Sequence, residues 1–93
     1  MRINIKSNFY IPGLEGEIVE IRDASTVRQL LEHISEISEG TFVFFEGGKE
    51  VLDPDDWEVD VNGISYDGFH VAAETRLNDN DIVEIRLLMY SGG

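Results

Sequence analysis

Residues 81–89 read DIVEIRLLM, and YSGG follows at 90–93. In the first stretch Val83, Ile85 and Leu87 alternate with two charged residues, which is the period-two pattern of a strand with one buried face. We expect the last strand of the protein here, with those three apolar side chains toward the core. Glycine is a poor way to end a structural element, because its free backbone carries the largest ordering cost. Two glycines soon after a strand are therefore either a frayed end without a role or a sign that the backbone itself has a function.

Two further strand patterns open the chain. Residues 2–6 (RINIK) and 17–22 (EIVEIR) both place apolar side chains on one face and polar ones on the other. The segment 8–16 between them holds one proline and two glycines, a composition typical of turns. The three segments together predict a hairpin with a long loop.

A helical pattern follows. Thr26 is placed to cap the helix, with Gln29 at the spacing of a capping box, and Ser25 is an alternative cap. We expect the helix to stop at Gly40. Its apolar residues recur at helical spacing and form a stripe that a sheet must cover, namely Val27, Leu30, Leu31, Ile34 and Ile37.

Residues 41–77 are less regular. Residues 41–45 (TFVFF) are strand-like, and because such a run would favour aggregation if exposed, we expect it to pack on the body of the protein or on a partner. Residues 57–63 (WEVDVNG) alternate cleanly and end in Asn-Gly, a favoured hairpin turn. A further short strand is expected near residues 70–72.

The order of these elements predicts the fold. Strand, strand, helix, strand, short strand and strand give an α+β protein, with a mixed sheet of four to five strands and one main helix on one face. The β-grasp is the compact fold with this order, and its first and last strands lie side by side in parallel. We expect one β-grasp domain over residues 1–89 and a flexible tail over residues 90–93.

Composition narrows the possible functions. The net charge is −12, which disfavours nucleic acid and anionic membranes as partners. It either favours a basic protein surface as a partner or serves only solubility. The chain has no cysteine, so disulfides and thiol chemistry are excluded, and a cytoplasmic location is expected. We predict no signal peptide and no segment that spans a membrane.

The usual patterns of catalytic and metal sites are missing. Asp53, Asp55 and Asp56 suggest calcium, but Pro54 interrupts the spacing of a calcium loop and a turn is the better interpretation. Gly47-Gly48 lacks the lysine and serine of a phosphate-binding loop. We therefore expect that the chain is not an enzyme by itself and that it binds neither a metal nor a cofactor.

Several segments resemble one family. The turn VNG at 61–63, the stretch DNDIVEI at 79–85 and the terminal SGG at 91–93 are similar to the MoaD/ThiS family of ubiquitin-like sulfur carriers. The likeness covers most of the chain and is weakest at 41–56. Asn80 stands where the family usually has glycine, and asparagine is a good replacement in a left-handed turn. Met89-Tyr90 stands where small residues or proline often precede the diglycine.

The resemblance implies a chemistry for the tail. The carboxylate of Gly93 is ionised at neutral pH and would attack the α-phosphate of ATP on an E1-like adenylating enzyme. The ATP and Mg would be bound and used by that enzyme. A sulfur donor would then displace AMP and leave a thiocarboxylate. Gly92 and Gly93 lack Cβ atoms, so they can enter a buried site, and the four residues of the tail reach about 13 Å when extended.

The resemblance also implies partners and leaves alternatives open. The sulfur acceptor would be the large subunit of a molybdopterin synthase or an equivalent enzyme, and this chain would be its non-catalytic small subunit. We expect Leu88, Tyr90, Ser91 and Phe44 to contact partners. The alternatives are a thiamine-type carrier, a protein modifier joined to lysines through Gly93, and a ubiquitin-like binding module with an incidental diglycine.

Overall fold

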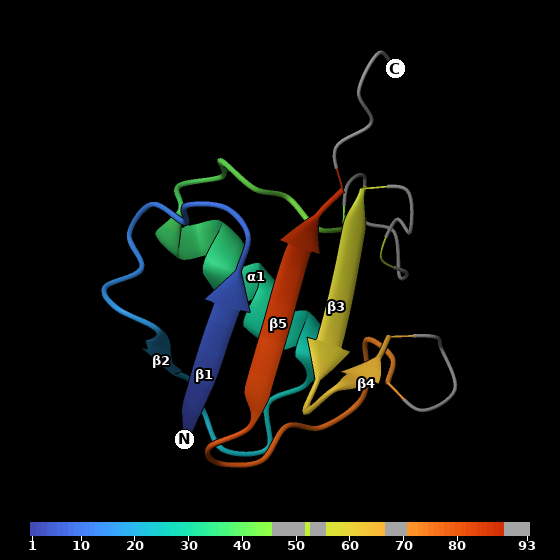
Figure 1. The fold of residues 1–93 in the computed structure, drawn as a ribbon. Helices are drawn as coiled ribbons and strands as arrows, with labels where there is room; N and C mark the ends of the chain where they lie inside the picture. Colours follow the sequence, from blue (N-terminus) through green and yellow to red (C-terminus); the bar gives the residue numbers. More distant parts are fainter. Residues whose placement is uncertain (46–51, 53–55, 67–70, 89–93) are drawn as a thin grey trace.

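The computed structural model describes residues 1–45, 52, 56–66 and 71–88. They form a mixed five-stranded sheet with the order β2-β1-β5-β3-β4, and helix α1 crosses one face of it (Figure 1). The elements are β1 (Arg2–Ser7), β2 (Ile18–Glu20), α1 (Val27–Ile37), β3 (Trp57–Val61), β4 (Ile64–Ser65) and β5 (Ile82–Leu87).

The last strand lies at the centre of the sheet. β5 pairs in parallel with β1, with Ile5 opposite Val83, and antiparallel with β3, with Val59 opposite Ile85. β1 also pairs antiparallel with β2, as expected for a hairpin. A parallel neighbour requires a long crossover connection, and α1 lies within it. The arrangement confirms the predicted α+β fold, a ubiquitin-like β-grasp.

The helix begins where the sequence predicts. The hydroxyl of Thr26 accepts a hydrogen bond from the backbone N–H of Gln29 (3.2 Å), and the side chain of Gln29 accepts one from the N–H of Thr26 (2.8 Å). This reciprocal pair is the predicted capping box. Four residues of the apolar stripe are fully buried and join the core under the sheet, namely Val27, Leu30, Leu31 and Ile34.

The helix ends earlier than expected. Its last residue is Ile37, and the left-handed residue after the C-cap is Glu39 (φ 54°), not a glycine. The N–H of Gly40 donates to the carbonyl of Ser35 (2.9 Å), and that of Glu39 donates to Glu36 (3.0 Å). These two bonds are those of a Schellman motif. Gly40 therefore closes the motif, three residues after the last residue of the helix.

Two turns at one end of the sheet use residues that tolerate positive φ. Asn62 (φ 52°) and Gly63 (φ 83°) connect β3 to β4, which confirms the predicted Asn-Gly turn. Asn80 (φ 68°) leads into β5, so asparagine does occupy a left-handed position there. The N–H of Asn80 donates to the carbonyl of Arg2 (2.7 Å), which ties this turn to the start of β1.

Several predictions about strands were wrong in detail. Residues 41–45 form no strand, and β2 has three residues because only Ile18–Glu20 pair with β1. The short strand is not at 70–72: it follows the Asn-Gly turn directly, at Ile64–Ser65. Residue 70 lies outside the described residues.

Candidate functional site

The sheet brings the ends of two strands together. Because β1 and β5 are parallel, both finish at the same edge of the sheet (Figure 1). β5 ends at Leu87, and only Leu88 of the residues that follow is described. Any chain that continues from β5 therefore departs from the middle of this edge.

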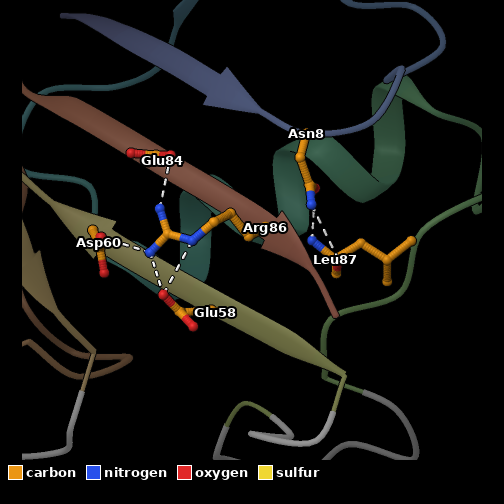
Figure 2. A network of polar contacts seen from close by, with 6 residues as sticks. All are labelled: Asn8, Glu58, Asp60, Glu84, Arg86 and Leu87. Carbon is orange, nitrogen blue, oxygen red and sulfur yellow. Dashed lines mark hydrogen bonds and ion pairs between the residues drawn. The ribbon is translucent and has the colours of Figure 1, made fainter. Parts of the chain in front are cut away.

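The side chain of Asn8 holds Leu87 from the β1 side. The N–H of Leu87 donates to Asn8 Oδ1 (2.9 Å), and Asn8 Nδ2 donates to the carbonyl oxygen of Leu87 (3.2 Å), as Figure 2 shows. Both backbone groups of Leu87 on this side are thus paired. A side-chain amide can do so because it offers one donor and one acceptor in the same plane.

The next residue is held from the β3 side. The N–H of Leu88 donates to the carbonyl oxygen of Asp56 (2.9 Å), just before β3 begins. Within the sheet, Leu87 pairs with Trp57, the first residue of β3. The side chain of Leu88 is partly buried. The backbone at residues 87 and 88 is therefore fixed on both sides at the edge of the sheet.

Aromatic rings gather around Trp57 at this edge. The ring of Trp57 lies 4.4 Å from Phe44, 5.6 Å from Phe9 and 6.1 Å from Phe42, measured between centroids. Phe9 and Phe42 are themselves 4.8 Å apart. Such tilted and edge-on contacts add to the burial of apolar area. The aromatic cluster therefore packs where β5 ends, since Trp57 pairs with Leu87.

The open face of the sheet carries a charged network. Arg86 on β5 contacts Glu84 on its own strand and Glu58 and Asp60 on β3, with the Asp60 oxygen 2.7 Å away (Figure 2). These hydrogen bonds, that of Asp60 above all and then those of Glu58 and Glu84, raise the pKa of Arg86 above its ordinary value. Three carboxylates against one guanidinium leave this network with a net negative charge.

The predicted site residues divide into three groups. Gly92, Gly93, Tyr90 and Ser91 lie outside the described residues. Leu88 lies at the fixed end of β5, and its role in partner binding stays a prediction.

Phe44 was assigned to a partner surface, but its side chain is only 3% exposed and packs against Trp57. Of the two expectations for residues 41–45, packing on the body is the one that the structure shows for Phe44 and Phe45. A side chain with so little exposed area offers a partner almost no contact surface, so its burial argues against a role for Phe44 in partner binding.

Sequence reasoning missed Asn8 and Asp56. Both belong to turn-like segments, where asparagine and aspartate have no distinctive pattern. Their contacts join positions 79 and 32 residues apart, since Asn8 meets Leu87 and Asp56 meets Leu88. Only the pairing of distant strands brings these residues together.

In the described part of the chain, no group of three or more histidine or acidic side chains could hold a metal ion. No helix among these residues is long and apolar enough to cross a membrane. An open groove lies between α1 and the β2 side of the sheet, lined among others by Arg22, Gln29 and His33.

Comparison with known proteins gives a consistent result. No family model matches the chain, and no curated protein matches it by sequence. A solved structure of a Pyrococcus furiosus protein described as molybdopterin converting factor, subunit 1, is 26% identical, with a TM-score of 0.67 over 95% of this chain and 98% of that one. The resemblance to MoaD/ThiS-type proteins is confirmed.

Two proteins of Haloferax volcanii share the fold. SAMP1 is 18% identical over the whole of both chains, with a TM-score of 0.70. The HVO 2177 protein is 19% identical over 99% of this chain and 87% of that one, with a TM-score of 0.69. Likeness at this level of identity shows a common ubiquitin-like fold alone.

Proposed function

We propose that the chain is a ubiquitin-like carrier whose terminal carboxylate, on Gly93, is activated by a partner enzyme. The observation that carries this proposal is the fixed exit of the chain from β5, with Leu87 and Leu88 each paired to a neighbouring segment. Five residues follow Leu88 and end in two glycines. A rigid body with a thin terminal segment is suited to present a reactive group inside another protein.

The activation step requires only the carboxylate from this chain. A carboxylate oxygen of Gly93 attacks the α-phosphate of ATP, pyrophosphate leaves, and an acyl-adenylate forms. The E1-like enzyme binds ATP and Mg and supplies the catalytic groups, so the carrier is its substrate. A sulfur donor then attacks the carbonyl carbon, AMP leaves, and the terminus becomes a thiocarboxylate.

We propose that the sulfur of the thiocarboxylate is used in the synthesis of molybdopterin. The support is the likeness, over nearly the full length of both chains, to the molybdopterin converting factor subunit of Pyrococcus furiosus. In this role the thiocarboxylate end enters the large synthase subunit, or an equivalent acceptor, which performs the transfer.

A protein modifier is the second candidate. The same acyl-adenylate can be passed on until Gly93 forms an isopeptide bond with a lysine. The observation that favours this candidate is the fold shared with SAMP1, one of the small archaeal modifier proteins. Intact-mass analysis of the protein from its native host separates the two: a sulfur carrier gains the mass difference between sulfur and oxygen, and a modifier appears on other proteins.

The activation step is tested by ATP–pyrophosphate exchange with the native activating enzyme. We compare the unchanged chain with a chain extended by one alanine after Gly93 and with one that lacks Gly93. The extended form keeps the fold and the charge but moves the carboxylate one residue on and adds a Cβ atom. We expect exchange with the unchanged chain and background with the other two.

A binding measurement provides the control. All three forms should bind the activating enzyme through the folded body, since the change lies beyond it. Equal exchange by all three forms would refute both the carrier and the modifier, and would leave the plain binding module.

A further inference from the structure

We propose that Asn8 is a positioning residue for the reactive tail: its side-chain amide fixes Leu87 so that the chain leaves the sheet in one direction. This inference rests on the proposed function, because it assigns to Asn8 a part in delivering the terminal carboxylate. Asn8 touches neither ATP nor the terminus, and it acts through the backbone of Leu87.

The side-chain amide of Asn8 extends the pairing of β1 with β5 beyond the last backbone pair between these two strands. The parallel ladder between β1 and β5 ends where Ser7 faces Ile85. Two residues later, Leu87 finds on the β1 side the side chain of Asn8, which both accepts from its N–H (2.9 Å) and donates to its carbonyl (3.2 Å). Without this side chain, the N–H and the carbonyl of Leu87 would bond to water. The β1 side of β5 would then be unpaired beyond Ile85.

Asn8 is itself held in place. On one side it follows β1 directly. On the other, the ring of Phe9 packs 4.8 Å from Phe42 and 5.6 Å from Trp57, and the hydroxyl of Ser7 donates to the carbonyl of Phe9 (2.8 Å). The amide therefore extends from an anchored backbone and can act as a fixed point. An unanchored side chain could not direct another segment in this way.

The position of the pair explains why it bears on the reaction. The five residues after Leu88 reach at most about 18 Å, so a shift of the backbone at Leu87 changes which points the terminal carboxylate can reach. A displacement of about 1 Å can lower the rate of a positioned reaction by about a hundredfold. Because Asn8 is exposed and Leu88 is held separately by the carbonyl oxygen of Asp56, we expect a substitution of Asn8 to leave the docking surface in place.

The test compares Asn8→Ala with Asn62→Gly. Asn62 contacts the other end of the same strand: its Oδ1 accepts from the N–H of Ile82 (2.9 Å), and its Nδ2 donates to the side-chain carboxylate of Asp81 (2.9 Å). Glycine suits the positive φ of Asn62, so this control removes one hydrogen bond from the backbone of β5 and one from the side chain of the residue before it, without backbone strain. Both variants are assayed well below their melting temperatures.

We expect Asn8→Ala to lower kcat for ATP–pyrophosphate exchange about tenfold while KM for the carrier changes less than about twofold. Asn62→Gly should leave both constants within about twofold of the unchanged chain. A tenfold change corresponds to about 1.4 kcal/mol in the barrier. A purely structural role for Asn8 predicts equal kcat values in the two variants.

A third variant separates the donor from the acceptor. Asn8→Asp keeps an oxygen that can accept from the N–H of Leu87 but places a carboxylate oxygen against the carbonyl of Leu87, so its kcat should fall at least as far as that of Asn8→Ala. An unchanged kcat in both Asn8 variants, or an equal fall in Asn62→Gly, would overturn the inference while wild-type exchange upheld the proposed function. No exchange by the unchanged chain would instead overturn the proposed function.

Discussion

The guanidinium of Arg86 lies 2.7 Å from one carboxylate oxygen of Asp60 on the neighbouring strand, and the other oxygen of Asp60 is buried without a hydrogen-bond partner among the described residues. The side chain of Asp60 is only 17% exposed, so Arg86 is the group that makes its charge tolerable. A partly buried carboxylate that loses its partner keeps the cost of desolvation.

We expect Arg86→Ala to lower the free energy of unfolding by about 1–3 kcal/mol, because it leaves Asp60 unpaired beside two further carboxylates. Urea unfolding followed by circular dichroism measures the change. The double variant with Asp60→Asn should recover part of the loss. A double variant as unstable as Arg86→Ala alone would show that Asp60 is not the source of the cost.

The same network predicts how the effect of Arg86→Ala depends on pH. The carboxylates raise the pKa of Arg86, so the stability that this residue contributes stays constant between neutral pH and the ordinary arginine pKa and is lost as the pH rises beyond that range. The loss caused by Arg86→Ala should therefore be the same at pH 7 and pH 9 in urea titrations. A loss that shrinks between these two values would mean that another group controls the network.

The buried stripe of α1 should carry much of the stability. Leu30 is fully buried, so Leu30→Ala should cost about 2–5 kcal/mol through lost burial and the cavity left behind. Glu36→Ala, on the exposed face of the same helix, should change stability by less than about 0.5 kcal/mol. Thermal melts of both variants test the assignment, which fails if the two melt together.

Asn80 should accept glycine but not alanine. Its φ of 68° costs an L-residue about 1–2 kcal/mol, a cost that glycine avoids and asparagine lessens. We expect Asn80→Gly to be nearly neutral and Asn80→Ala to destabilise by about 1 kcal/mol in urea unfolding. If the two variants were equally stable, the left-handed turn would not be what selects the residue before β5.

Leu88 tests the docking of the body beside the tail. We expect Leu88→Asp to weaken binding to the activating enzyme about tenfold, because it places a charge at the end of β5 where the proposed partner contacts the carrier. Ile18→Asp, at an exposed position on the edge strand β2, is the matched control and should bind normally. Calorimetric titration of both variants decides, and equal affinities would remove Leu88 from the interface.

Much of the fold could be predicted because local patterns carry it. The stripe of α1, its capping box and the alternation of β1, β3 and β5 depend on residues close in sequence, and each was found where expected. The aromatic run at 41–45 could not be assigned in this way. Its β-propensity predicts a strand, but Phe44 instead packs against Trp57 and the ring of Phe45 lies in the core under the guanidinium of Arg28, because burial of aromatic surface outweighs local preference.

By itself, the sequence determined the order of the elements and the presence of a diglycine after the last strand, since these depend on composition and on periods of two and 3.6 residues. Only the tertiary structure decided how the chain is held where it leaves the sheet. The pairs of Asn8 with Leu87 and of Asp56 with Leu88 join segments that meet only when β5 enters the sheet between β1 and β3. Hydrogen bonds between positions so far apart have no local signal, because their geometry is set by the packing of the whole sheet.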